Sequence, residues 1–171
     1  MEFMEVVKKR YACKKYDGAP IDPAQLDAVL EAGRLAPTAK DEQEHHVYVA
    51  ESPEALAKVD QVTPCRYGAP AVLIVTGNAA KSFVYPGGQL NAGLEDAAIV
   101  ATHMMLAATD AGLESVWVNN FNPAEVSKVF GLPEDETVLM LLDLGHAAAE
   151  GGAPLEKHTI RKPLDQLVTR L

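Results

Sequence analysis

Basic side chains gather at the two ends of this chain, where they could serve an anion. Five of the 15 lysines and arginines lie within the first 15 residues, and three more form a second group at positions 157–162: Lys8, Lys9, Arg10, Lys14, Lys15, Lys157, Arg161 and Lys162. On a chain with a formal net charge of −9, such clusters are either solvated faces or a site for a small anion. A third polar patch, the loop Ala36–Gln43, lies between an expected helix and an expected strand.

Several familiar catalytic motifs are missing from the sequence. It contains no phosphate-binding loop with Lys and Ser/Thr, and Gly87-Gly88 alone falls short of a dinucleotide fingerprint. There is no Gly-x-Ser-x-Gly turn, and Cys13 has no histidine near it in the sequence. No side chain is therefore nominated as a catalytic acid, base or nucleophile.

The histidines do not predict a metal site. His45 and His46 are adjacent in an expected strand, so their side chains point to opposite faces and cannot hold one ion together. His103 lies within an apolar helical run, where a hydrogen-bonded core histidine is commoner than a ligand. We expect no metal.

The element that must position these patches is one long helix, predicted over Gln89–Leu113. Its middle, from Ala97 to Thr109, consists mostly of alanine, leucine and methionine and contains no glycine or proline. Such a helix would be roughly 36 Å long. Apolar residues on nearly every side predict that protein surrounds it, either as a core helix or as one shared between core and dimer interface.

Start and stop signals place the other elements. Asp22-Pro23, Ser52-Pro53 and Asn122-Pro123 each combine an N-cap residue with proline at the first helical position. Apolar or alternating runs predict four strands: His45–Ala50, Ala71–Thr76, Ser115–Asn119 and Thr137–Leu144. Short helices are expected over Glu5–Tyr11 and Pro163–Leu167. Strands separated by helices indicate an α+β or a mixed α/β layered fold.

The composition of the chain limits which classes of protein it can belong to. A chain of 171 residues with 48% hydrophobic and 23% charged residues is typical of one globular domain, 1–171. The net negative charge argues against a nucleic-acid partner. The first residues lack the layout of a signal peptide, no apolar run is long enough for a membrane span, and the two cysteines suggest no disulfide framework. We therefore expect a cytoplasmic protein.

Four segments in order resemble the nitroreductase family of flavin enzymes. The first two are Arg10–Tyr16, which resembles the family's basic opening, and Ala36–Gln43, which resembles its Ala-Pro-Ser-x-x-Asn-x-Gln loop. The run from Glu95 through Val118 resembles the central helix and the following strand, and Leu144-Gly145-His146 with Thr159–Leu164 resembles the closing segments. Each motif alone is weak, but together they cover nearly the whole chain.

This resemblance implies a nitroreductase-like α+β fold, with a central, mostly antiparallel sheet flanked by helices and a long buried central helix. It also implies a homodimer with two FMN sites at the interface. One chain would contact the phosphate, ribityl chain and pyrimidine edge, and the other would reach the flavin. By position, the first group is Arg10, Tyr11, Ala12, Lys14 and Arg161, and the second is Pro37, Thr38, Ala39 and Asp41. Arginine suits the nearly dianionic FMN phosphate because it forms bidentate, charge-assisted hydrogen bonds.

The implied activity is a two-step exchange. NADH or NADPH would give hydride to the flavin, and a nitroaromatic, quinone or similar conjugated acceptor would then be reduced in the same space. The sequence departs from the family pattern where Glu44-His45 replaces Pro-Trp, and at two expected site residues: Ala12 replaces a serine, and Asp41 stands where asparagine is usual. The last two departures favour an alternative, in which the protein is a flavin-binding sensor or carrier without efficient turnover.

Overall fold

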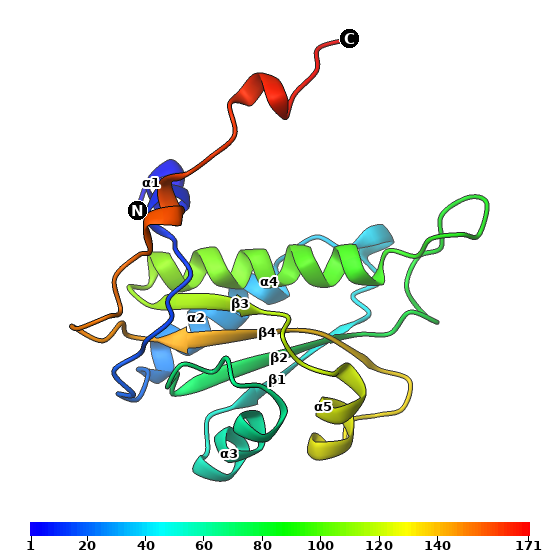
Figure 1. Cartoon of the computed structure of the whole chain (residues 1–171). Helices are drawn as coiled ribbons and strands as arrows, with labels where there is room; N and C mark the ends of the chain where they lie inside the picture. The colour runs from blue at the N-terminus through cyan, green and yellow to red at the C-terminus, as the bar shows by residue number, and fades with distance from the viewer.

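The computed structural model describes residues 1–171 and is organised around a four-stranded antiparallel sheet (Figure 1). Its strands are β1 (His45–Ala50), β2 (Ala71–Gly77), β3 (Glu114–Val118) and β4 (Thr137–Gly145). Their order across the sheet is β1-β2-β4-β3, and every residue of the central strand β2 is buried. The predicted α+β class, with a mostly antiparallel sheet flanked by helices, is confirmed, and all four predicted strands are present within one residue of their expected bounds.

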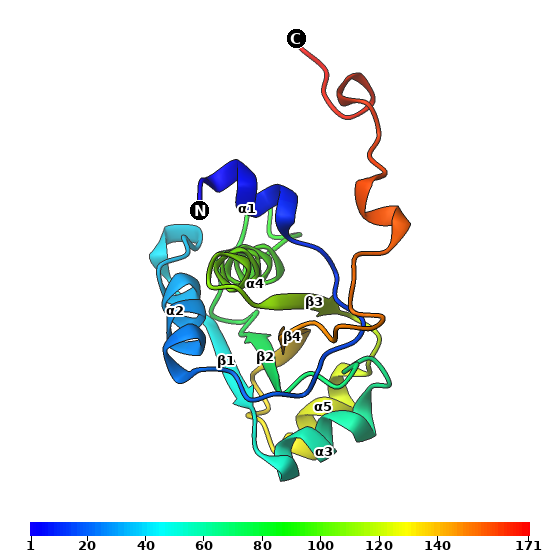
Figure 2. The ribbon, with the colours of Figure 1, turned by 90° about the vertical axis from the view of Figure 1, so that its left-hand side faces the viewer.

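Helices cover both faces of the sheet (Figure 2). α2 (Pro23–Arg34) and α4 (Gly93–Asp110) lie on one face, and α3 (Pro53–Val62) and α5 (Pro123–Phe130) lie on the other. Side chains of β2 alternate between the two layers, because successive residues of a strand point to opposite faces. Leu73 and Val75 pack in the α2–α4 core, whereas Val72 and Ile74 pack in the α3–α5 core.

The predicted helix starts are confirmed. In α2, α3 and α5 the side-chain oxygen of the N-cap residue accepts a hydrogen bond from a backbone N–H in the first turn, and proline follows the cap. These bonds satisfy donors that a helix start otherwise leaves unpaired. The three caps are Asp22, Ser52 and Asn122. The first helix, α1 (Phe3–Lys9), begins two residues earlier than predicted and packs against α4.

The central helix is shorter than predicted. Residues before Gly93 form a narrow hairpin in which the Tyr85 N–H donates to the Leu90 carbonyl at 2.9 Å, and the Ala92 N–H donates to the Phe83 carbonyl at 2.8 Å. Two consecutive glycines with positive φ, Gly87 and Gly88, make the turn. The predicted helix was therefore too long at its start, because Leu90 and Ala92 form their backbone hydrogen bonds across the hairpin. None of the helices combines the length and the apolar character needed to cross a bilayer.

Burial of α4 is one-sided within the single chain. Ala97, Val100 and Met104 face the core with no exposed surface, but Leu94 and Ile99 are 61% and 37% exposed. His103 is also exposed, with its Nδ1 atom 2.8 Å from the Ile99 carbonyl oxygen, so the prediction of a core histidine is wrong. The histidine satisfies its ring nitrogen on its own helix and therefore needs no partner in the core.

The end of the chain leaves the body of the protein. Two short 3-10 turns, η2 (Glu156–Thr159) and η3 (Leu164–Gln166), interrupt it, so the predicted helix Pro163–Leu167 is only a single turn. Figures 1 and 2 both show the last residues extending away from the sheet and its helices. Leu164, Leu167 and Val168 on this arm are at least half exposed.

Candidate functional site

The segment after α1 runs beside the edge strand β3. The Cys13 N–H donates to the Ser115 carbonyl at 3.0 Å, and Ala12 forms a parallel bridge with Ser115. Alternation along this extended segment buries Cys13 in the core and leaves Ala12 and Lys14 exposed on the other side. The pairing with β3 therefore decides which of these side chains are available to a ligand.

A glycine turn brings the tail back to this segment. The Ala148 N–H donates to the Lys15 carbonyl at 3.0 Å, and the Tyr11 hydroxyl donates to the Gly152 carbonyl at 2.9 Å. A Cβ atom at Gly152 would lie 2.4 Å from the Ala148 carbonyl oxygen, so no other residue fits there without a backbone shift. The turn directs the following residues toward Arg10.

The two basic ends of the chain meet at one hollow of about 280 Å³. It is lined by two arginines, two lysines, one histidine and no carboxylate: Arg10, Tyr11, Ala12, Lys14, Leu155, Lys157, His158 and Arg161. All five residues predicted near the N-terminus and the tail are in this group. The residues assigned from the resemblance did not include Leu155, Lys157 or His158, although Lys157 belonged to the basic group noted near the end of the chain.

The two arginines influence each other across the hollow. Burial lowers the pKa of Arg10 below its ordinary value, and the nearby positive charge of Arg161 lowers it further. Both effects penalise the charged form of Arg10. A bound anion between the two guanidinium groups would remove that penalty, because each arginine would gain an opposite charge as its neighbour.

The other predicted residues, Pro37, Thr38, Ala39 and Asp41, lie in a tightly folded loop. Lys40, Asp41 and Gln43 all have positive φ, which is uncommon for residues with a Cβ atom. The loop is held by its own polar groups: the Gln43 side-chain amide donates to the Asp41 carboxylate at 3.0 Å, and the Gln43 N–H donates to Thr38 Oγ1 at 3.1 Å. Asp41 is thus an acceptor within the loop itself.

Asp96 anchors this loop to α4. Its carboxylate accepts the Ala39 N–H at 2.9 Å, and the residue is 6% exposed. A carboxylate in the first turn of a helix also interacts favourably with the helix dipole. Sequence reasoning did not include Asp96 in the site, although an acid at the start of the predicted central helix was visible.

The two groups of predicted residues lie at opposite ends of α4. The loop is tied to Asp96 at the N-terminal end of the helix, whereas the amino group of Met1, at the start of α1, pairs with Asp110 at the other end. Helix α1, which Arg10 follows, and the start of the tail lie near that second end (Figure 1). An 18-residue helix is about 27 Å long, so one chain brings together only the basic group.

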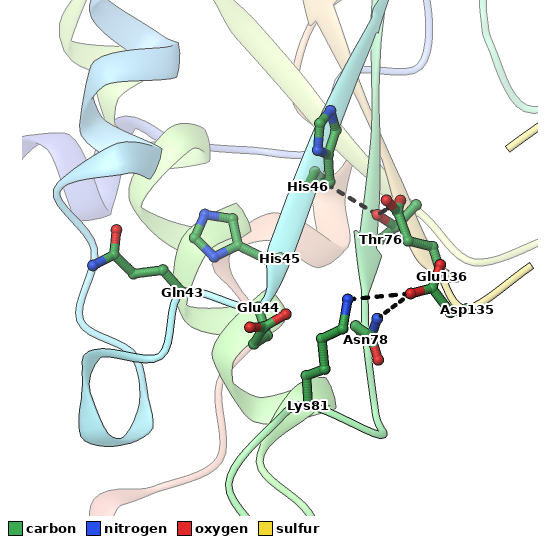
Figure 3. Close-up of a pocket in the computed structure, with 9 residues that line it drawn as sticks. All are labelled: Gln43, Glu44, His45, His46, Thr76, Asn78, Lys81, Asp135 and Glu136. Atoms are coloured by element: carbon green, nitrogen blue, oxygen red, sulfur yellow. Dashed lines mark hydrogen bonds and ion pairs between the residues drawn. The ribbon is translucent and has the colours of Figure 1, made fainter. Parts of the chain in front are cut away.

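A second pocket, of about 150 Å³, lies where β1 begins and β2 ends (Figure 3). Its nine lining residues are all polar, and their contacts are largely with one another. Asn78 and Lys81 both donate to the Asp135 carboxylate, at 2.8 and 3.3 Å, and the Thr76 hydroxyl donates to Glu136 at 2.6 Å. Because it has no apolar wall, this pocket does not suit a planar aromatic ring. We assign it the structural role of joining β2 to the start of β4.

Comparison with known proteins identifies the family. The nitroreductase family model matches residues 7–67 and 64–146. A protein of Methanothermobacter thermautotrophicus, provisionally named an NADH dehydrogenase/NAD(P)H nitroreductase, is 28% identical over 162 residues, covering 89% of this chain and 81% of its own. The chain therefore belongs to the nitroreductase family.

Solved structures agree with this assignment. The crystal structure of a nitroreductase family protein from Clostridium difficile 630 has a TM-score of 0.91 and 32% identity, and the match covers 99% of this chain and 98% of that one. A protein from Exiguobacterium sibiricum, solved in complex with FMN, has a TM-score of 0.86 and 21% identity over 100% and 98% of the two chains. The fold of this protein is that of the nitroreductases.

Proposed function

We propose that this protein is an FMN-dependent NAD(P)H oxidoreductase of the nitroreductase family. Family membership supports the oxidoreductase class, and the neighbour solved with FMN supports the choice of cofactor. The observation that carries the proposal is the meeting of Arg10 and Arg161, from opposite ends of the chain, in a hollow without a carboxylate. A phosphate monoester close to a dianion suits that lining, because it can neutralise two guanidinium groups at once.

The residues present fit FMN in two further respects. Ala12 and Lys14 are exposed on the same side of the extended segment, and Leu155 adds an apolar contact to the hollow. When bound, FMN would supply the redox chemistry, passing hydride from NADH or NADPH to a nitroaromatic, quinone or similar conjugated acceptor. The protein would bind and orient the cofactor, and a cation such as Lys14 near its pyrimidine edge would favour the reduced form.

We propose further that the protein is a homodimer, with each flavin site built from both chains. Pro37, Thr38, Ala39 and Asp41 of one protomer would complete the hollow of its partner, since one chain keeps these groups at opposite ends of α4. Exposed apolar residues support an interface, because many of them lie on α1, on the outer side of α4 and on the arm at the end of the chain. Apolar side chains gathered in this way usually mark a surface that another protein covers.

The test begins with the visible spectrum of the purified protein after incubation with FMN and removal of free cofactor. We expect bound flavin in the wild type and a loss of at least tenfold in affinity in Arg10→Ala. Arg34→Ala is the matched control, because Arg34 is exposed and pairs only with Glu31 on its own helix. Undiminished FMN binding by Arg10→Ala would contradict the phosphate assignment.

Rapid mixing of the FMN-loaded protein with NADH or NADPH then tests turnover. In an oxidoreductase, the nicotinamide reduces the flavin, and the visible absorbance of the flavin falls rapidly after mixing. A quinone or nitroaromatic then reoxidises the flavin and restores the absorbance. A flavin that stays oxidised with both nicotinamides would instead support the sensor or carrier. The position of Asp41 favours this second candidate, because its negatively charged carboxylate lies in the loop that would approach the flavin.

A further inference from the structure

His158 lies in the hollow beside the two arginines, yet it belongs to none of the motifs that predicted the site. Its Nε2 atom is 3.3 Å from the Lys8 carbonyl oxygen at the end of α1. Its ring also makes an edge contact with Tyr11, with the centroids 6.1 Å apart and the planes at 70°. These two contacts hold the imidazole in the wall of the hollow and leave its Nδ1 atom without a hydrogen bond in the protein.

We propose that His158 is a third ligand of the FMN phosphate and makes cofactor affinity depend on pH. This inference rests on the proposed function, because it concerns the same hollow. A protonated imidazole donates from both nitrogens. With Nε2 facing the Lys8 carbonyl, Nδ1–H is the donor left for a phosphate held between Arg10 and Arg161.

The other groups that face the hollow do not change charge between pH 6.5 and pH 8. The charged groups among them are arginines and lysines, side-chain types that carry their charge well above neutral pH: Arg10 from the end of α1, Lys14 from the extended segment, and Lys157 and Arg161 from the tail. Tyr11 stays neutral, since burial above all raises its pKa to about 12 and its hydroxyl is held by Gly152. Histidine is the side-chain type that can change its charge near neutral pH, and His158 is the one histidine in this lining.

The phosphate itself also titrates, near pH 6, and this effect opposes that of the histidine. Lowering the pH removes charge from the phosphate, whereas protonation of an imidazole beside it would add an opposite charge. Comparison of the wild type with a variant lacking the imidazole separates the two effects, because the phosphate titration is common to both proteins. Riboflavin, which has no phosphate, separates contacts to the phosphate from contacts to the ring.

The experiment measures FMN and riboflavin dissociation constants at pH 6.5 and pH 8 for the wild type, His158→Gln and His46→Gln. Glutamine can keep a hydrogen bond to the Lys8 carbonyl, and His46 is a matched control on β1, in the separate polar pocket. Thermal unfolding of each variant checks that it is folded. We expect the advantage of the wild type over His158→Gln to be about tenfold at pH 6.5 and to vanish at pH 8. Riboflavin should show no difference, and His46→Gln should follow the wild type.

Three outcomes would overturn the proposal. FMN affinity of His158→Gln that follows the wild type at both pH values would show that the imidazole makes no contact with the phosphate. An equal loss at both pH values, or a similar loss for riboflavin, would show that His158 only positions the tail. If the wild type bound no FMN at either pH, the proposed function itself would fall together with this inference.

Discussion

The Tyr11 hydroxyl donates a 2.9 Å hydrogen bond to the carbonyl of Gly152, a residue 141 positions further along the chain. This bond joins the segment that follows α1 to the glycine turn that redirects the tail. Arg10 immediately precedes Tyr11, and Arg161 follows the turn by nine residues, so the bond links the two halves of the basic hollow. The geometry of the candidate phosphate site thus depends on a contact between a phenol and a backbone carbonyl.

Tyr11→Phe should weaken this link without emptying the space that the ring fills. We expect a loss of about 1 kcal/mol in the free energy of unfolding, the usual net contribution of one such hydrogen bond. FMN affinity should fall several-fold, because Arg161 would be held less firmly opposite Arg10. Urea denaturation and FMN titration measure the two effects. Tyr85→Phe is the control, since that hydroxyl donates to Glu95 on the surface, at the end of α4 away from the hollow. An equal loss in both variants would contradict the role of the Tyr11 bond.

Asp96 should be needed to hold the loop that contains Pro37 and Asp41. Asp96→Ala leaves the Ala39 N–H without its acceptor and removes a carboxylate from the start of α4, so we expect a loss of about 1–3 kcal/mol in urea denaturation. Asp96→Asn keeps an acceptor of the same shape and should lose less. If the loop completes the partner's flavin site, FMN retention should fall in the same order, and equal retention by both variants would argue against that role.

Asp143 should make the stability of the protein fall as the pH rises. Its side chain on β4 has no exposed surface, and neither carboxylate oxygen has a hydrogen-bond partner. Burial raises its pKa to about 8, although the nearby Arg66 opposes the shift. Because the folded pKa lies above the unfolded value, the contribution of this group to stability is fully present below about pH 4. It is lost progressively as the pH rises to 8, by up to about 1.4 kcal/mol per pH unit.

Asp143→Asn removes this titration. The free energy of unfolding of the variant, relative to the wild type, should therefore increase between pH 5 and pH 8 in urea denaturation. Asp135→Asn is the control. The ion pair of Asp135 with Lys81 lowers the pKa of that carboxyl, so the difference between this variant and the wild type should stay constant between pH 5 and pH 8. A constant difference between Asp143→Asn and the wild type across the range would show that Asp143 is ionised in the folded protein.

Ile99→Glu tests the proposed dimer. Ile99 is 37% exposed on the outer side of α4, where a charge costs little in one chain but would be buried in an interface. We expect the variant to elute as a monomer in size-exclusion chromatography with light scattering, and to retain little FMN. Lys128→Glu changes the charge on α5, on the other side of the sheet, and should remain dimeric. A dimeric Ile99→Glu protein with normal FMN content would place the interface elsewhere.

Local interactions explain which features were predictable from the sequence alone. A cap such as Asp22 followed by Pro23 determines a helix start through atoms only a few residues apart, and an apolar run such as Ala71–Thr76 identifies a central strand. The positive φ of Gly112 after α4 was also predictable, because glycine carries no Cβ penalty there. The family resemblance, carried by motifs in order, added the pairing of Arg10 with Arg161.

Tertiary structure alone decided the features that depend on distant contacts. The position of His158 depends on a contact with Lys8, 150 residues away, and on the turn at Gly152, whose carbonyl is held by the distant Tyr11 hydroxyl. The shortened start of α4 likewise followed from a hairpin in which Phe83 and Ala92 compete with the helix for hydrogen bonds. Such contacts depend on which segments meet in space, and that is determined by the packing of the whole chain.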